Sequence, residues 1–540
     1  MKHAFGSLVI VLATIIFVNA NQRILRMDKF AAKKPHQQTE VTFAFASYYQ
    51  NNMVLQMEPH SAVIWGYGTP GATVNISVNV QDVYSTKVKV HSGFPDRGIW
   101  MVKIKPQPAG STSDIQGVHD HFGRLQWILL KNLLFGEVYV CSGQSNMVFT
   151  MSMVYNSSEE LKETVNYKDI RLFTVNQNFS DDPLYDISVI EESWSIPSPE
   201  TVGGKDWSYF SAVCWLFGKY LYDELKIPIG LVASTWGGTP VEPWAPPEVF
   251  DVCNETSNDE IPSAYDNDGF TGYWDNSKIW NAQIHPLINM TIKGVLWYQG
   301  ESNEAYHTNS YQCVFPQMIK SWRKNWYEGT MMSTDPDFPF GFVQIGDKTS
   351  TSGSFELIRW HQTADYGYVP NPEMENTFMA VAIDLPDNDS PYASVHTRDK
   401  QDVAHRLVAG ALAVAYHRTM VFDGPFPQKL TENTKHEILI EYSNYQQLSV
   451  VDNNNFQICC ADEKCQVTDP SDSPLWFTTP ILGSTDHTIT ISSKKCSDDF
   501  KYAEKVRYAW ELTPCEFKNC SVYNTLGFPA PPFFLDVTSK

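Results

Sequence analysis

Three short apolar segments in the middle of the chain each run into a polar turn that contains glycine, and this arrangement constrains the fold more than any other feature. With their turns, these segments are residues 137–147, 228–239 and 292–303. Apolar runs of this length are typical of buried strands, and glycine and serine supply the turn chemistry that ends a strand. Parallel strands bring their carboxyl ends to one edge of a sheet, where open α/β folds bind ligands. We therefore expect a parallel sheet with a polar active site at that edge, in an enzyme.

Ser145 lies in the first of these turns, which reads Gly-Gln-Ser-Asn-Met at residues 143–147. A hydroxyl at the end of a buried strand is held rigidly and is still exposed, so Ser145 is the candidate nucleophile. The nucleophile elbow of α/β-hydrolases, Gly-x-Ser-x-Gly, needs a small residue two positions after the serine, where this chain has Met147. A different serine hydrolase scaffold is therefore expected.

The chain of 540 residues exceeds the size at which single cores stop growing, so two or three domains are expected. Residues 41–135 show short alternating runs separated by turns, which predict an N-terminal β-sandwich-like module. Residues 136–421 alternate apolar strands with helix-period segments, the pattern of a parallel α/β core. Residues 422–540 return to strands and carry a cysteine cluster, which indicates a C-terminal disulfide-bearing β module.

Four distinctive sequence blocks follow one another along the chain. They read Gly-Gln-Ser-Asn-Met at 143–147, Trp-Gly-Gly-Thr-Pro at 236–240, Trp-Tyr-Gln-Gly-Glu-Ser at 297–302 and Val-His-Thr-Arg-Asp-Lys-Gln at 395–401. With these blocks, and with further stretches toward both ends at 46–51, 63–68, 507–510 and 526–532, the chain resembles the SGNH hydrolase superfamily and, within it, the sialate O-acetylesterase family. The resemblance implies an SGNH-like α/β core and a serine carboxylesterase that removes O-acetyl groups from sialic acids through an acyl-enzyme. This chemistry needs no cofactor and no metal.

His396 is the candidate base that takes the proton of the serine. It lies just ahead of a helix predicted to begin near Thr397, which puts its ring at the same sheet edge, and it falls in the histidine block of the resemblance. His405 is about two helical turns further on and would face elsewhere. Three other histidines lie in a polar loop or before a proline: His119, His121 and His285.

The acid that would orient the base departs from the family pattern. Most SGNH hydrolases carry an aspartate three residues before the histidine, where this chain has Ala393. Asp384 ends the apolar strand 378–383 and should emerge at the same edge, so it is predicted to orient His396. Other acidic residues nearby are Asp387 and Asp389 on the following loop, and Asp399, which helix capping already explains. The alternative is a Ser–His dyad whose ring is held by a backbone carbonyl.

Three N–H groups are predicted to stabilise the oxyanion. The backbone N–H of Ser145 is the first, and the pair Gly237 and Gly238 supplies the second, because glycine lets the backbone approach the substrate closely. The resemblance favours Gly238, with Gly237 as the alternative. It also implies that the side-chain amide of Gln299 takes the place of the asparagine found in most SGNH proteins. Such donors are each worth about 10²–10³ in turnover.

The substrate is indicated by the resemblance alone, and no substrate-binding residue is identified. Arg359 and Arg398 are candidates for a substrate carboxylate, because a guanidinium binds one bidentately, with helix-end and salt-bridge roles equally open. An acetyl xylan or other sugar acetylesterase would use the same chemistry, and a catalytically inert glycan-binding protein is the alternative of a different class. The formal net charge of −21 and a pI near 5.1 argue against nucleic acid or an anionic membrane as a partner.

Residues 1–20 have the pattern of a secretory signal peptide. Two charged or polar residues precede the apolar stretch 8–18, and small residues follow at 18–20. No later segment has the long uncharged apolar run of a membrane span. N-linked glycans are predicted at sequons that begin at Asn75, Asn156, Asn178, Asn254, Asn289, Asn388 and Asn519. We expect a protein of the secretory pathway, either lysosomal or secreted.

Ten cysteines in that compartment favour disulfides. Pairing is predicted for the late cluster Cys459, Cys460, Cys465, Cys496, Cys515 and Cys520. Zinc is the competing interpretation there, but the cluster has no Cys-x-x-Cys pair and no accompanying histidines. Cys141 and Cys214 lie in apolar, core-like segments and are expected to be buried thiols, whereas Cys253 and Cys313 could pair.

Overall fold

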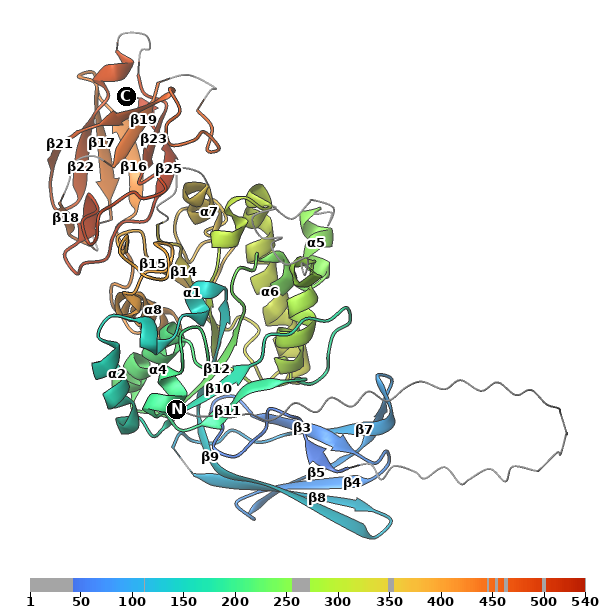
Figure 1. The fold of residues 1–540 in the computed structure, drawn as a ribbon. Helices are drawn as coiled ribbons and strands as arrows, with labels where there is room; N and C mark the ends of the chain where they lie inside the picture. Colours follow the sequence, from blue (N-terminus) through green and yellow to red (C-terminus); the bar gives the residue numbers. More distant parts are fainter. Residues whose placement is uncertain are drawn as a thin grey trace, which may run out of the picture. The chain divides into compact units, whose positions relative to one another are not determined.

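One long strand, β9 (Arg124–Gly143), connects an antiparallel β module to the parallel sheet of the core (Figure 1). Its first half pairs with β8 (Ser113–His121), and its second half lies between two parallel strands of the core. The computed structural model describes residues 42–539, except 111, 255–271, 348–353, 444–445, 452–454, 461–464 and 498–501, and it does not describe the side chains at 94–96. The predicted signal peptide lies outside the described residues.

The N-terminal β module consists of two antiparallel sheets that share one buried core. Trp65 and Trp100 from one sheet and Ile76 and Ile115 from the other belong to the same buried cluster. The strands of the first sheet are β1 (Ala44–Phe45), β3 (Val63–Gly68), β7 (Phe94–Lys103) and β6 (Lys89–His91), and those of the second are β5 (Asp82–Lys87), β4 (Thr73–Val78), β8 and the start of β9. A short strand, β2 (Val54–Gln56), runs parallel to β9. An N-terminal β module is therefore present, as predicted, and its sandwich-like character stays a prediction.

The core sheet is parallel except for one edge strand, as the three apolar segments predict. Its order is β11 (Ile190–Ser195), β10 (Ile170–Val175), β12 (Ile229–Thr235), β9, β13 (Gly294–Tyr298), β14 (Phe340–Gln344) and β15 (Thr377–Val381), with only β11 antiparallel. The strands β12, β13, β14 and β15 are buried along their whole length, because helices cover both faces of a parallel sheet. The turns after β9, β12 and β13 therefore meet at one edge.

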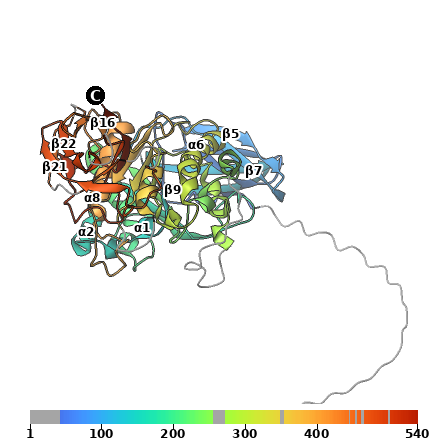
Figure 2. The same cartoon turned by 90° about the horizontal axis from the view of Figure 1, so that it is seen from above.

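Helices cover both faces of this sheet (Figures 1 and 2). On one face, Tyr139 and Cys141 pack in a cluster with α4 (Ala212–Leu225) and α8 (Lys400–Val414). On the other face, Val138 and Val140 belong to the cluster that includes α6 (Tyr311–Gly329). The shorter helices are α1 (Ser145–Val148), α2 (Ser157–Glu163), α3 (Pro199–Gly203), α5 (Glu248–Cys253) and α7 (Phe355–His361). The predicted α/β class is confirmed.

Cys141 and Cys214 are bonded to each other, so the prediction of two buried thiols is wrong. Alternation along β9 turns Cys141 toward α4, and Cys214 lies in the first turn of that helix, with a Cα–Cα distance of 5.9 Å. Cys253 and Cys313 also pair, which joins α5 to α6. The late cluster is paired as predicted, in the bonds Cys459–Cys465, Cys460–Cys496 and Cys515–Cys520.

The C-terminal β module contains the late disulfides and contacts the core. One sheet has the order β21 (Ile481–Ser484), β22 (Thr488–Ser492), β17 (Glu437–Tyr442), β16 (Pro427–Glu432) and β26 (Thr538–Ser539). The others are β20 (Trp476–Thr479), β19 (Phe456–Cys459), β23 (Lys505–Tyr508) and β25 (Phe533–Asp536), and the pair β18 (Leu448–Val450) and β24 (Val522–Asn524). Lys518 of this module forms ion pairs with Asp399 and Asp402 beside α8.

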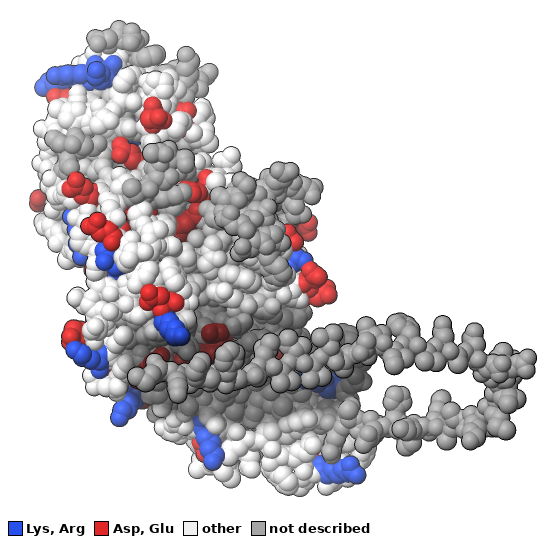
Figure 3. All heavy atoms as spheres, viewed as in Figure 1, with Lys and Arg blue, Asp and Glu red and all other residues white. Residues whose placement is uncertain are grey.

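The face of the molecule seen in Figure 3 carries acidic and basic side chains interspersed. On this face the excess of acidic residues is therefore not gathered into one large patch. Among the described residues, no helix is both long enough and apolar enough to cross a membrane.

Candidate active site

Ser145 is the first residue of α1, directly after β9. The turn that carries it is fixed against the end of β13, since the Gln144 N–H donates to the Tyr298 carbonyl at 3.0 Å. Gly143 makes this contact possible: its φ is +136°, and a Cβ there would lie 2.2 Å from the Tyr298 oxygen. The Gln144 side-chain oxygen also accepts the Ser302 N–H at 3.2 Å. Two of the three predicted turns thus hold each other in place.

His396 reaches Ser145 and has a defined tautomer. Its Nε2 lies 2.8 Å from the Ser145 Oγ, and its Nδ1 lies 2.5 Å from the backbone carbonyl oxygen of Tyr392. A carbonyl can only accept, so Nδ1 carries the hydrogen and Nε2 presents its lone pair to the serine. Burial lowers the pKa of His396 to about 4, and the nearby Lys400 adds to this effect. The ring is therefore neutral, as a base must be.

The loop that carries the histidine is closed by its own hydrogen bonds. The His396 N–H donates to the Ala393 carbonyl at 2.9 Å, and the Ser390 hydroxyl donates to the His396 carbonyl at 2.8 Å. Ala393 adopts a left-handed backbone, with φ +75°. The position at which the family pattern has aspartate is thus part of a tight turn.

Asp384 does not contact His396, and the prediction that it orients the ring is wrong. Its buried carboxylate accepts two hydrogen bonds from the Arg406 guanidinium, at 2.6 and 2.9 Å, and a third from the Tyr523 hydroxyl at 3.3 Å. Arg406 lies on the buried face of α8, where a cation needs a paired and hydrogen-bonded anion. The geometry matches the alternative, a dyad whose ring is held by a backbone carbonyl.

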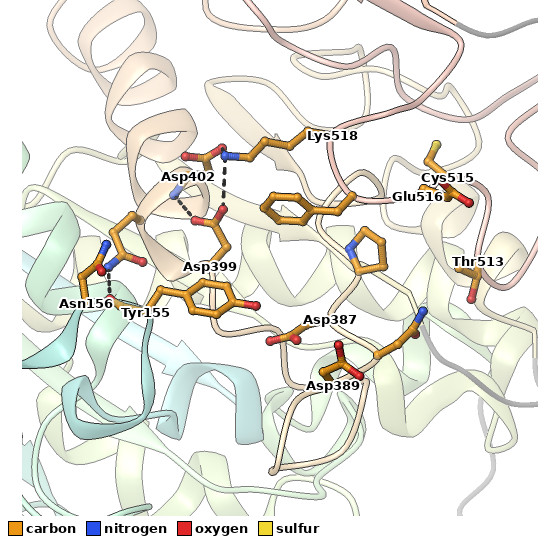
Figure 4. A pocket seen from close by; sticks show the side chains of 14 residues that line it. Tyr155, Asn156, Asp387, Asp389, Asp399, Asp402, Thr513, Cys515, Glu516 and Lys518 are labelled. Carbon is orange, nitrogen blue, oxygen red and sulfur yellow. Dashed lines mark hydrogen bonds and ion pairs between the residues drawn. The ribbon is translucent and has the colours of Figure 1, made fainter.

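The remaining acidic candidates also have other partners. Asp387 forms a bidentate ion pair with Arg398, at 2.7 Å for both contacts. Asp399 accepts the Asp402 N–H at 3.1 Å and caps α8, which confirms its predicted capping role. The acidic residues Asp387, Asp389 and Asp399 line a cavity of about 820 Å³ beside the histidine loop. In this cavity Lys518 forms an ion pair with Asp399 (Figure 4). Ser145 and His396 are not among the described residues that line this cavity.

Gln299 is fully buried, and its amide points away from the serine. Its Nε2 donates to the Thr239 carbonyl at 3.2 Å and to the Asn303 Oδ1 at 2.7 Å, while its Oε1 accepts the Tyr311 hydroxyl at 3.0 Å. One amide hydrogen joins the turns after β12 and β13, and the other closes the turn after β13 on itself. The prediction that Gln299 is an oxyanion donor is therefore wrong.

Of the two glycines after β12, Gly237 lies against the serine. A Cβ on Gly237 would be 3.5 Å from the Ser145 Cβ, which is ordinary contact distance. Gly238 has φ +73°, a left-handed conformation that favours glycine, and the space around it is open. The structure therefore places Gly237 against the serine turn, and the role of either glycine as an oxyanion donor stays a prediction.

A buried network behind the dyad was not foreseen. The Lys400 ammonium donates to the Asn146 Oδ1 at 2.6 Å, and the Asn146 Nδ2 donates to the Glu301 carboxylate at 2.6 Å and to the Val395 carbonyl at 2.9 Å. Burial lowers the pKa of Lys400 to about 7. Asn146 thus ties the serine turn to the loop of His396. Asn146, Glu301 and Lys400 lie in three of the distinctive sequence blocks, but their spacing along the chain does not predict that they contact one another.

Both predicted carboxylate-binding arginines already have partners within the protein. Arg359 is buried and donates to backbone carbonyls that include Ile345 at 3.1 Å and Glu511 at 2.6 Å, so its predicted candidacy is wrong. Arg398 has the salt-bridge role that was left open, with Asp387. Its guanidinium also lies over the Tyr155 ring, 4.6 Å from the centroid.

Two family models match the chain. Residues 136–413 match the family described as "Carbohydrate esterase, sialic acid-specific acetylesterase", and residues 428–537 match the "Sialate O-acetylesterase C-terminal domain". The chain is 42% identical to sialate O-acetylesterase of Mus musculus over 534 residues, covering 93% of this chain and 95% of the mouse protein. It is also 42% identical to the Homo sapiens sialate O-acetylesterase over 509 residues, covering 93% and 94%.

A solved structure has the same fold. The crystal structure of a carbohydrate acetylesterase from Xanthomonas citri aligns with a TM-score of 0.73 and 23% sequence identity, covering 92% of this chain and 100% of that one. The parallel core and both flanking β modules are therefore an arrangement already known among solved proteins.

Proposed function

This chain belongs to the sialate O-acetylesterase family, and from that premise we propose that it hydrolyses O-acetyl esters of sialic acids, with Ser145 as nucleophile and His396 as base. It is an esterase by family. One observation carries the assignment of residues: the Ser145 Oγ lies 2.8 Å from the Nε2 of a neutral imidazole whose other nitrogen is fixed by the Tyr392 carbonyl.

Acylation follows from this geometry. The Ser145 Oγ attacks the acetyl carbonyl carbon while its proton passes to the His396 Nε2. A C–O bond forms, the carbonyl π electrons move to oxygen, and a tetrahedral oxyanion results. When this intermediate collapses, the bond to the sugar oxygen breaks and the imidazolium returns the proton to that oxygen. The sugar leaves as an alcohol, and acetyl-serine remains.

Deacylation repeats these steps with water. His396 takes a proton from water as the water oxygen attacks the acetyl-serine carbonyl, and it then protonates Oγ as the acyl bond breaks. Acetic acid is released, and both residues return to their starting forms. The Tyr392 carbonyl accepts the Nδ1 hydrogen throughout, so it holds the ring in the one tautomer that can act as base.

The oxyanion donors that we propose are the backbone N–H groups of Ser145 and Gly238, with Gly237 as the alternative to Gly238. Among the described residues, none of these three N–H groups donates to a backbone carbonyl, so all are available to a substrate. Gly237 and Gly238 have no side chain that would keep a carbonyl oxygen away from the serine.

The proposal is tested by measuring acetate release from O-acetylated sialic acid and from acetylated xylan under the same conditions. O-acetylated sialic acid is expected to be cleaved with a higher kcat/KM than acetylated xylan. The reverse order would favour the acetyl xylan esterase alternative. Failure to hydrolyse even p-nitrophenyl acetate, in a folded preparation, would favour an inert glycan-binding protein.

The pH dependence of kcat/KM should reflect the low pKa of His396. A histidine at its ordinary value would lose activity near pH 6.5. Here the base form persists until the pH falls through the lowered pKa of about 4, so activity should be retained at about pH 5 and fall below it. Initial rates across this range, with a return to neutral pH as control for unfolding, make the measurement. An acid limb near 6.5 would contradict the buried, neutral ring.

We further propose that the protein is made in the secretory pathway, with removal of residues 1–20, N-linked glycans at its sequons, and a lysosomal or secreted destination. The five disulfides support a compartment that permits oxidation.

We also propose domains at 41–135, 136–421 and 422–540. Support comes from the change of pairing along β9 and the return to antiparallel strands after α8.

A further inference from the structure

A short loop before α4 presents two aromatic residues in an unusual backbone conformation. Trp207 has φ +62° and Tyr209 has φ +70°, and both side chains are exposed, by 38% and 46%. Bulky residues rarely adopt positive φ, and such residues cluster where function requires a particular side-chain direction. The loop begins at Gly204, where a Cβ would lie 2.5 Å from the Ser208 carbonyl oxygen.

The Trp207 ring lies against the catalytic base. Its centroid is 4.9 Å from that of His396, with the rings nearly perpendicular at 71°. It also contacts the buried Phe149 ring at 5.5 Å and the Tyr392 ring at 6.0 Å. One part of Trp207 therefore packs on the residues that hold the imidazole, while the remainder is open to solvent beside it.

Polar contacts hold the loop in this position. The Asp206 carboxylate accepts hydrogen bonds from the Ser152 hydroxyl at 3.0 Å and from the Tyr392 hydroxyl at 3.3 Å. The Thr150 hydroxyl donates to the Lys205 carbonyl at 3.2 Å. Because the two residues that precede Trp207 are held by these bonds, the ring is in place before a substrate arrives.

The chemistry of the dyad decides which part of a substrate meets this ring. His396 must give its proton to the leaving oxygen, so that oxygen comes within hydrogen-bond reach of Nε2 and the alcohol lies beside the imidazole. A second aromatic pair, Trp236 and Tyr273, stacks at 4.7 Å, and Trp236 directly precedes Gly237, one of the proposed oxyanion donors. The leaving alcohol therefore lies on the side of Trp207.

We propose that Trp207 is the platform against which the apolar face of the leaving sugar packs, which makes it a specificity-determining residue for sugar esters. The inference rests on the proposed dyad of Ser145 and His396. Aromatic rings are the common apolar lining of small-molecule sites, and this one offers an exposed surface directly beside the proton donor.

The test compares two acetyl esters, O-acetylated sialic acid and trifluoroethyl acetate, whose alcohol has no ring. For Trp207→Leu, the ratio of kcat/KM for the sugar ester to kcat/KM for the small ester should fall on the order of tenfold, mainly through KM. Trp207→Phe keeps a ring and should restore most of the ratio. Trp127→Leu replaces an exposed tryptophan on β9 in the N-terminal module and serves as the matched control.

An unchanged ratio would overturn the proposal, even if both activities fall, because Trp207 would then act only by supporting His396. If Trp207→Leu hydrolyses neither ester, binding of free sialic acid to Ser145→Ala is compared with its binding to the double variant, and equal affinity also overturns the platform. If the wild type prefers acetylated xylan, the proposed substrate fails. The ratio of kcat/KM values is then measured with an acetylated xylo-oligosaccharide as the sugar ester. A ratio that is unchanged by Trp207→Leu overturns the platform, and a fall in the ratio supports it.

Discussion

Ser145→Ala is expected to lower the turnover of acetyl esters by about 10⁶-fold, the loss seen when the nucleophile of a serine triad is removed. In the proposed mechanism the Oγ forms the bond to the acetyl group, and no other described hydroxyl lies within hydrogen-bond distance of the His396 Nε2. Stability should change little, because the substitution removes one oxygen at a partly exposed position. Turnover of p-nitrophenyl acetate and of O-acetylated sialic acid measures the effect.

Ser142→Ala is the matched control for this substitution. Ser142 lies three residues earlier on β9, and its buried hydroxyl has no hydrogen-bond partner among the described residues. Removing it should leave turnover close to that of the wild type. If Ser145→Ala instead kept more than about a tenth of wild-type turnover, against the loss expected for a nucleophile, Ser145 would not be the nucleophile.

Asp384→Asn is expected to destabilise the fold by about 3–5 kcal/mol while changing the turnover of the folded enzyme only a few-fold. The substitution removes the carboxylate that pairs with two nitrogens of the Arg406 guanidinium, whose side chain is 8% exposed, and leaves the Asp402 carboxylate at 4.0 Å as a weaker partner. The His396 ring is untouched, because its Nδ1 is bonded to the Tyr392 carbonyl. Denaturant unfolding gives the stability, and active-site titration with turnover gives the activity per folded molecule.

Asp387→Asn provides the comparison, since Asp387 has a similar bidentate pair with Arg398, whose side chain is 24% exposed. Water can solvate that arginine, so the loss of stability should be smaller. The dyad would be contradicted if Asp384→Asn left stability intact and lowered turnover by about 10⁴, as expected for an acid that orients the base.

The sequence predicted the parts of the site that depend on where strands end. Ser145, Gly237 and Gly238 follow apolar strands, and the edge of a parallel sheet brings such positions together whatever the details of packing. His396 was found because it precedes a helix and stands in a recognisable block. These inferences needed only the periodicity of the chain and its resemblance to a family.

The errors concern side chains whose partners are distant in the sequence. Asp384 does emerge at the expected edge, but the sequence does not reveal that Arg406 lies beneath it. Gln299 is in the expected turn, but the sequence does not reveal that its amide donates to the Thr239 carbonyl, 60 residues earlier in the chain. The Cys141–Cys214 bond likewise depends on which face of β9 meets α4.

The carbonyl of Tyr392 has a consequence for how this enzyme tolerates mutation. Every amino acid carries a backbone carbonyl, so exchanging the side chain at position 392 does not delete the group that fixes the imidazole. A screen for inactivating missense changes should therefore recover Ser145 and His396 without a third position of equal severity. A serine esterase with a carboxylate in this role has three such vulnerable codons, whereas the proposed dyad has two.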